Sequence, residues 1–421
     1  MRTQLNLSIF SFLILFLFTA NGAFAQGVEG VDSGSETGVN AATQAGNWGF
    51  NNANSLRFSN TNNCFDGDKV SSLSQIGVGI DSYYNITDKL QAGLMINQSS
   101  WNSSQENSDD ESSSSFFGGG VQIGYNFLSN ENVVGQVYAS GGLASLKDTW
   151  TFSGGSESEL TGSNNNYEIG VRGIVPIGGN NLFGMLALKA FGHADCFEQD
   201  EVEEQYRTSG FGLDVEQSSF FSCASFDPCG KKGGEAYGDN FGLAGTITLP
   251  GSSGLWFRAG QDTYEYTFLS ENLEQVTNFT SINFDLDPTY YVFDYIGASL
   301  NIDLNSRTDK DDETDAKNGF SHYSIAPGVI IHVPSLPQVY GGFNYGFGSQ
   351  SSTFTNFMGE EETVSDGRSN WNAKLGYAQP MLQDQFITFG VNYGSASIND
   401  SDFSDKGWGV EFGLKSIIRS F

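Results

Sequence analysis

The chain has 421 residues, with 19 Lys and Arg against 49 Asp and Glu, a formal net charge of −30, and an aromatic content of 14%. Such a negative charge repels nucleic-acid phosphates and excludes nucleic-acid binding. The aromatic content excludes a disordered chain. Fifty-three Gly against 8 Pro, without long runs of helix-forming residues, favour an all-β protein with many turns.

The first 25 residues have the pattern of a secretory signal peptide. Arg2 precedes an apolar run over residues 9–18, and Ala25 ends a small-residue cleavage site. A run of about ten residues is too short to cross the roughly 30 Å of a bilayer core as a helix. We therefore predict a signal peptide at 1–25, a periplasmic N-terminal segment at 26–46 and one transmembrane β-barrel at 47–421.

The mature chain is dominated by alternation of apolar and polar residues, and no apolar stretch in it is long enough for a membrane-spanning helix. The first clear hairpin joins 76–80 to 90–96 across a turn at 86–89, and a second joins 117–127 to 133–139. This period of two is typical of strands. Further alternating segments lie at residues 167–171, 241–249, 255–259, 323–333, 339–347, 371–377, 387–393 and 408–414.

Short connections take turns with long polar ones. The long ones are expected near residues 102–114, 151–163, 195–233, 305–318, 349–368 and 395–406. Short periplasmic turns opposite long extracellular loops are the layout of bacterial outer-membrane barrels. We predict an all-β fold, a transmembrane antiparallel up-and-down β-barrel of about 16 strands within a range of roughly 14 to 18. The count of 16 includes weak strands at 47–58 and 275–286.

The C-terminus resembles the terminal insertion signal of bacterial outer-membrane barrels. The chain ends in Phe421 after an alternating strand with Trp408, Val410, Phe412 and Leu414. Phe421 is out of phase with these four apolar residues. The resemblance is to porin-like barrels in general, and it implies a bacterial outer-membrane location, contact with outer-membrane lipid and insertion by the barrel assembly machinery. It also implies a homotrimer, the state in which porins of this size often occur.

Four cysteines, Cys64, Cys196, Cys223 and Cys229, are assigned to the long loops. An even number of cysteines in an exported protein favours two disulfides, whose pairing the sequence leaves open. Zinc binding is the alternative. It is disfavoured because the chain has no C-x-x-C pair and no His beside three of the four cysteines.

Polar positions opposite the apolar stripe are predicted to line the interior of the barrel. The charged candidates for pore-lining positions are Asp81, Glu168, Arg172, Arg258, Asp262, Lys374, Glu411 and Lys415. Basic residues facing acidic ones would create a transverse field at a constriction, as in porins. Alternatively, they form ion pairs that stiffen the wall. Both interpretations stay open at this point.

Carboxylates gather in the predicted loops and would attract cations to a pore mouth. The cluster Asp309, Asp311, Asp312, Glu313 and Asp315 is a weak candidate for a metal site, because oxygen ligands bind divalent cations. The cluster lacks the Gly of a calcium loop at its sharp turn. No cofactor is expected, apart from divalent cations at the external loops.

His322 and Ser324 share one strand face and resemble the His and Ser of outer-membrane lipid hydrolases. Here the apolar Tyr323 and Ile325 make the lipid face, so the pair is predicted to face the lumen, away from acyl chains. The families concerned also place an Asn after the Ser. We therefore expect no enzymatic activity, and lipid hydrolysis is the third hypothesis.

The strand count carries the functional prediction, because a barrel of 16 to 18 strands leaves an aqueous channel. We predict a porin-like outer-membrane pore for passive diffusion of small hydrophilic solutes, with a preference for cations. The main alternative is a structural or adhesion barrel on the cell surface, with disulfide-linked acidic loops and a plugged lumen.

Overall fold

A computed structural model describes residues 40–51, 54–106, 108, 110–130, 132–152, 154, 156–178, 182–199, 202–221, 243–268, 271–355, 359–382, 385–399 and 401–419. The predicted signal peptide lies outside these ranges. None of the helices within them is long and apolar enough to span a bilayer.

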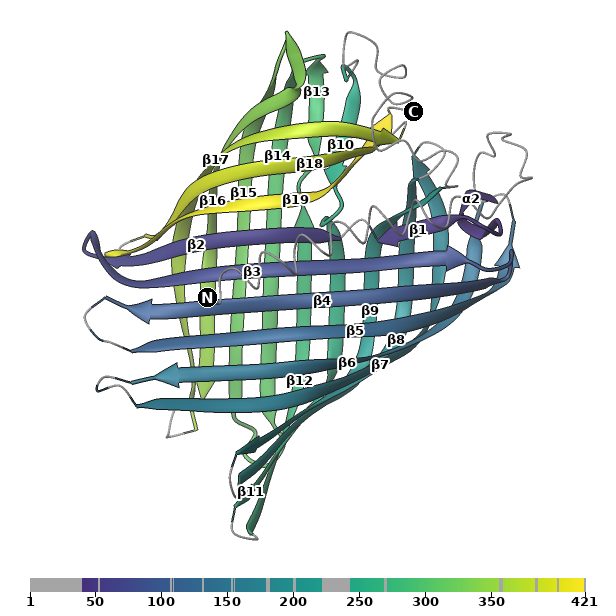
Figure 1. Cartoon of the computed structure of the whole chain (residues 1–421). Coiled ribbons are helices and arrows are strands. Elements are labelled where there is room, and N and C mark those ends of the chain that lie inside the picture. The colour runs from purple at the N-terminus through teal and green to yellow at the C-terminus, as the bar shows by residue number, and fades with distance from the viewer. Residues whose placement is uncertain are drawn as a thin grey trace.

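The molecule is a closed antiparallel β-barrel, as predicted (Figure 1). In the described chain, 16 strands form its main ring, and β19 pairs with β2 to close it. The ring strands are β2 (Ser55–Phe65), β3 (Asp68–Asn85), β4 (Leu90–Gln105), β5 (Glu111–Ser129), β6 (Val134–Thr151), β7 (Glu157–Gly178), β8 (Leu182–Gln199), β9 (Val202–Phe221), β11 (Gly254–Phe268), β12 (Glu271–Leu286), β14 (Ile296–Asp311), β15 (Lys317–Val333), β16 (Leu336–Thr355), β17 (Glu361–Leu382), β18 (Gln385–Ile398) and β19 (Phe403–Arg419).

Three short strands change the architecture at the short-turn end. β1 (Trp48–Asn51) pairs with both β3 and β9, so β1 and β3 to β9 close into an eight-stranded unit, the first lobe. β10 (Thr246–Pro250) pairs with β19 and with β13 (Thr289–Phe293), which pairs with β14. β10 and β13 to β19 thus close a second eight-stranded lobe. The 16-stranded ring at the loop end therefore divides into two smaller barrels at its base.

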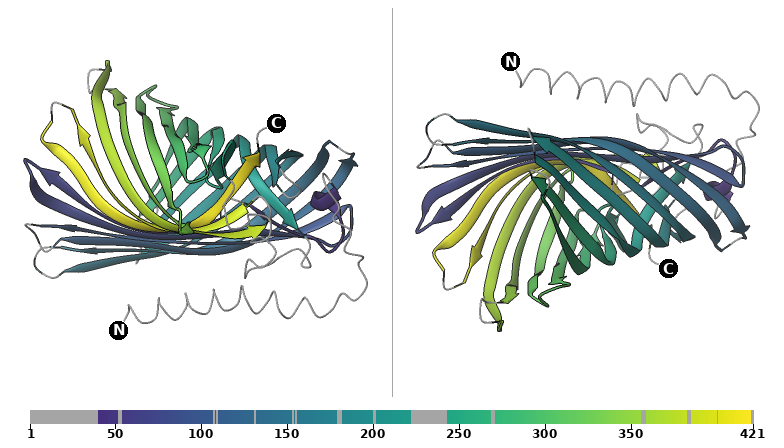
Figure 2. Two further views of the ribbon diagram at one scale, coloured as in Figure 1. Left: turned by 90° about the horizontal axis from the view of Figure 1, so that it is seen from above. Right: turned by 90° about the horizontal axis from the view of Figure 1, so that it is seen from below.

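The two lobes point in different directions. In Figure 1, α2 (Asn40–Thr43) and β1 lie at one corner of the molecule, and β10 and β13 lie at another. Figure 2 views the barrel from above and from below, and in it the blue strands and the green and yellow strands form two walls that meet at an angle. The barrel is therefore not a simple cylinder.

The outer face of the barrel is apolar. On β5, Phe117, Val121 and Ile123 are 54 to 61% exposed, whereas the intervening Gln122 is 5% exposed. On β8, Leu186 and Leu188 are exposed and Ala187 between them is buried. Large apolar side chains in this state need a lipid environment, because soluble proteins rarely expose wide apolar patches. The alternation in the sequence therefore identified the lipid face correctly.

Each lobe has its own apolar core. The first contains Ala41 and Ala42 of α2, together with Tyr83, Val134, Ile174, Phe183, Met185 and Phe220. The second contains Leu243, Tyr291, Ile330, Tyr340, Ala378, Phe386 and Ile417. An eight-stranded barrel has an interior just wide enough for side chains to fill. At the short-turn end, which forms the base of the molecule, apolar side chains thus fill both eight-stranded lobes.

Three details of the predicted strand layout were wrong. The segments assigned to long loops are mostly strand, because the ladders continue as far as Gln105 and Glu111 between β4 and β5, and to Gln199 and Val202 between β8 and β9. β9 was missed altogether, since its charged residues hid a short apolar alternation. The predicted strand at 241–249 corresponds to β10, which belongs only to the second lobe. The count of 16 is nevertheless right, because one ring strand, β9, was missed and one strand outside the ring, β10, was counted.

Candidate functional site: a charged network and a polar chamber

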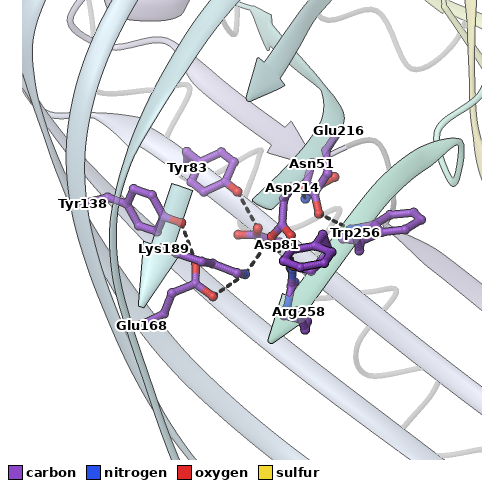
Figure 3. Close-up of polar contacts among 11 residues, drawn as sticks. Asn51, Asp81, Tyr83, Tyr138, Glu168, Lys189, Asp214, Glu216, Trp256 and Arg258 are labelled. Atoms are coloured by element: carbon purple, nitrogen blue, oxygen red, sulfur yellow. Dashed lines mark hydrogen bonds and ion pairs between the residues drawn. The ribbon is translucent and has the colours of Figure 1, made fainter. Parts of the chain in front are cut away.

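A network of buried charges lies inside the barrel above the first lobe (Figure 3). Lys189 Nζ on β8 lies 2.5 Å from Glu168 Oε2 on β7 and 2.7 Å from Asp214 Oδ2 on β9. Asp214 also accepts hydrogen bonds from both terminal nitrogens of Arg258 on β11. Lys189 and Asp214 are about one-tenth exposed or less, so these charges are shielded from water. Strands on both sides of the β9–β11 seam are thereby linked by charge.

Neutral groups complete the network. The Tyr83 hydroxyl donates to Asp81, and the Tyr138 hydroxyl donates to Glu168 Oε1 at 2.7 Å. Glu216 accepts from Asn51 Nδ2 at 2.9 Å and from Trp256 Nε1 at 2.7 Å, as Figure 3 shows. Because Asn51 belongs to β1, the strand that closes the first lobe is hydrogen-bonded to the ring strands.

Arg172 sits below this network with a different set of partners. Its Nε donates to Gln136 Oε1 at 2.7 Å and one terminal nitrogen donates to Gln91 Oε1 at 2.8 Å. Its guanidinium carbon lies 4.9 Å from the ring centroids of both Tyr83 and Tyr138. The cation is therefore held by amide oxygens and aromatic faces.

The network brings together four of the eight predicted pore-lining residues, Asp81, Glu168, Arg172 and Arg258. Sequence reasoning missed Lys189, Asp214, Glu216, Tyr83 and Tyr138. For Lys189 the signal was present, because it has the same parity as the buried Ala187 and the opposite parity to the exposed Leu188. Asp214 and Glu216 were missed because their strand was assigned to a loop.

A polar chamber lies beside the network, within the ring on the side of the second lobe. Its volume is about 950 Å³. Strands β2 to β4, β12 and β14 to β19 contribute to its lining. Of the remaining candidates, Lys374 and Glu411 line this chamber. Lys374 Nζ lies 3.7 Å from Asp287 Oδ2, and Arg368 lies 3.8 Å from Asp405.

The last two candidates lie apart from one another. Lys415 is at the base of the chamber wall, opposite Pro250 of β10 and Phe386 of β18. Asp262 lies further toward the loop end, where it accepts from Thr208 Oγ1 at 2.6 Å and pairs with Arg307 at 2.6 Å. The eight candidates thus belong to four separate places.

Two of the four cysteines lie in strands of the described chain. Cys64 lies in β2 and Cys196 in β8, so their assignment to loops was wrong, and within the described chain both are free. They are strand residues because the ladders extend through the predicted loops. Cys223 and Cys229 lie outside the described residues.

The carboxylates of the weak metal candidate do not converge on a shared point. Asp309 binds Arg307, Asp312 accepts from Asn278, and Asp311 accepts from Gln275 and Thr314. Lys310 lies 2.6 Å from Asp315 and holds the pKa of that carboxyl below its usual range. No group of three metal-ligating side chains occurs among the residues that the structure describes. Glu313 belongs to the same turn.

His322 and Ser324 point toward the lumen but are not bonded to each other in the described part of the chain. His322 Nδ1 lies 3.0 Å from Asp303 Oδ1, and Ser324 Oγ accepts from Asn370 Nδ2 at 3.2 Å. His322 thus contacts a side chain of β14, and Ser324 contacts a side chain of β17.

Comparison with known proteins finds no matching family model and no matching curated protein. Among solved structures, CdiB from Acinetobacter baumannii is similar at 10% identity and a TM-score of 0.39, covering 87% of this chain and 60% of CdiB. The chain thus spans 60% of the length of that protein.

Two further similar structures are a loop-deletion mutant of OmpT, an outer membrane protein of Vibrio cholerae, and OccK2 of Pseudomonas aeruginosa in complex with glucuronate. Both have 10% identity and a TM-score of 0.29. They cover 87% and 88% of this chain, and 97% of each known chain is covered.

The structure itself gives the cellular location. Only helices and closed barrels satisfy every backbone hydrogen bond in lipid, and this chain is a closed barrel with an apolar outer face. The protein is a β-barrel of the bacterial outer membrane.

Proposed function

We propose that this outer-membrane barrel admits small hydrophilic solutes into its polar chamber and keeps its base closed at rest. The observation that carries the proposal is the division of the ring into two eight-stranded lobes, each with an apolar core. In such narrow barrels side chains fill the interior, whereas a ring of 16 strands leaves room for water. Solute would therefore enter the wide half and stop above the lobes.

The charges in the ring favour a closed base and disfavour a pore with an open, charged constriction. Lys189 and Arg258 are paired with Glu168 and Asp214, and Arg172 is enclosed by two tyrosines. These groups hold β7, β8, β9 and β11 together above the first lobe. The paired charges neutralise one another, so they would contribute little to the field acting on a passing ion.

The test is the conductance of the refolded mature protein in a planar bilayer. We expect the membrane to stay mostly non-conducting, with at most brief openings. A steady ohmic conductance in every inserted molecule would contradict the closed base. Heat-modifiable gel mobility of the same sample serves as the control that the barrel has folded.

Passive diffusion of small solutes with a cation preference is the second candidate. The polar, hydrated chamber and the net charge of −30 favour it. It differs from the first candidate in requiring a continuous path through at least one lobe. Steady conductance together with swelling of liposomes in isotonic sugar would support this function over the closed base.

A further inference from the structure

We propose that the chamber binds a neutral saccharide, which stacks on Trp101 and is hydrogen-bonded by asparagines of β17. This inference deepens the proposed function by naming the class of solute that the chamber accepts. It depends on the chamber being open to solute. It does not depend on whether the lobes conduct.

Trp101 provides an aromatic surface inside the chamber. The β3–β4 ladder places Trp101 opposite Gln75, and both residues line the chamber. The side chain is 39% exposed. An indole presents a broad apolar face with negative charge density, which attracts the slightly positive C–H groups on one face of a sugar ring. An exposed Trp on the interior face of a polar wall is suited to this contact.

Strand β17 supplies amide groups to the same chamber. Asn370 and Asn372 of β17 line the chamber, and Asn370 Nδ2 donates to Ser324 Oγ at 3.2 Å. The Oδ1 atoms of both asparagines are buried and accept no hydrogen bond from a described residue. A side-chain amide both donates and accepts, and a sugar hydroxyl does the same, so the two groups are complementary. These Oδ1 atoms are shielded from the chamber, so each amide has to turn before a sugar hydroxyl can donate to it.

The charges of the chamber favour a neutral ligand over an ionic one. Its basic residues Arg57, Arg368 and Lys374 are matched by the acidic Asp285, Asp287, Asp405 and Glu411. Arg57 and Glu411 are register partners on neighbouring strands. With both signs spread over the wall, neither an anion nor a cation gains a strong net attraction. The volume of about 950 Å³ lies within the range of pockets that enclose small ligands.

The experiment is calorimetric titration of the refolded mature protein with maltotriose and cellotriose, and with glutamate and arginine as charged solutes of small size. We expect saturable binding of at least one trisaccharide and none of the charged solutes. Trp101→Ala should weaken that binding by roughly tenfold or more, and Trp101→Phe by less because it retains an aromatic face. Asn372→Ala should also weaken it.

Trp150→Ala is the matched control, because Trp150 lies near the loop end of β6 but does not line the chamber. It should bind as the wild type does. Binding by Trp101→Ala at wild-type strength, or a preference for glutamate or arginine, would overturn the proposal. Failure of both trisaccharides to bind to heat-modifiable protein would also overturn it. Conductance tests the closed base separately, so the two proposals fail by different measurements.

If Trp101→Ala does not fold, a comparison of tryptophan fluorescence between the wild type and Trp101→Phe tests the stacking instead. Trisaccharide should protect part of the wild-type fluorescence from acrylamide quenching, and this protected part should be absent from Trp101→Phe. Equal protection in both proteins would contradict stacking on Trp101.

Discussion

Lys189 is the residue on which the charged network depends. It is the single cation between Glu168 and Asp214, and the three side chains come from three neighbouring strands. A buried ion pair contributes little net stability by itself, but removing one partner leaves a charge without compensation in a poorly hydrated place. Asp214 keeps Arg258 as a partner, whereas among the described residues Glu168 keeps only the neutral Tyr138 hydroxyl.

We therefore expect Lys189→Met to destabilise the barrel by about 3 kcal/mol, measured by urea titration of the folded band on gels. The comparison is Lys147→Met, which removes an exposed ion pair with Glu159 at 2.6 Å. Exposed pairs contribute at most about 1 kcal/mol, so this variant should remain close to the wild type. Adding Glu168→Gln to Lys189→Met should recover part of the loss. Equal stability of Lys189→Met and Lys147→Met would show that the network does not depend on Lys189.

At the scale of elements, β1 and β10 are the strands that close the two lobes. Each is four or five residues long. β1 bridges the long strands β3 and β9, and β10 bridges β19 and the short strand β13. β1 needs a small residue at its centre. A Cβ atom on Gly49 would lie 2.5 Å from Cε1 of Phe220, whose ring is fully buried in the core of the first lobe.

Gly49→Ala should therefore lower stability by about 1 to 3 kcal/mol, because the fixed Phe220 ring has to move. It should also increase the frequency of conducting events, since it weakens the strand that closes the first lobe. Gly79→Ala on β3 is the control, because nothing lies within 4 Å of a Cβ atom there. Reduced freedom of the unfolded chain should leave that control neutral or slightly more stable. Identical conductance of the two variants would contradict the sealing role of β1.

The sequence predicted the elements that have a lipid face and failed where that face is short. β5 and β16 were found because several exposed apolar residues alternate with small or polar ones. β9 has only Phe211, Leu213 and Val215 in alternation, among charged side chains of which Asp214 and Glu216 belong to the network. The weak strand predicted at 47–58 contains β1, and the alternation at 241–249 overlaps β10, but neither pattern distinguishes a closing strand from a ring strand. Their second pairing partner is a long-range property that no local pattern contains.

At the scale of the whole molecule, the two halves of the chain follow one plan. Each begins with a short closing strand, β1 or β10, and continues into a strand that belongs only to the wide ring, β2 or β11. These two strands carry Arg57 and Arg258, which line the chamber and complete the network, respectively. The predicted count of 16 strands is confirmed, whereas the division of the ring into two lobes was not predicted. The interior width changes from one end to the other.

The net charge of −30 belongs to the whole molecule, and it leads to a prediction about ions in the chamber. In the sequence, carboxylates are concentrated around the junction of β8 and β9, at Glu198, Asp200, Glu201, Glu203 and Glu204. Their field should raise the concentration of cations near the loop end and lower that of anions. Trp101 reports on this concentration because it is partly exposed within the chamber.

The Trp101 fluorescence is obtained as the difference between wild type and Trp101→Phe, and its quenching by each ion is expressed relative to quenching by neutral acrylamide. Caesium should then quench it more strongly than iodide does. The Debye length falls from about 10 Å at 0.1 M salt to about 3 Å at 1 M, so the difference should fade in concentrated salt. Replacing the five carboxylates by amides should reduce it at low salt. If iodide quenches as well as caesium at every ionic strength, the basic Arg57, Arg368 and Lys374 govern the ions in the chamber, and the cation preference does not hold.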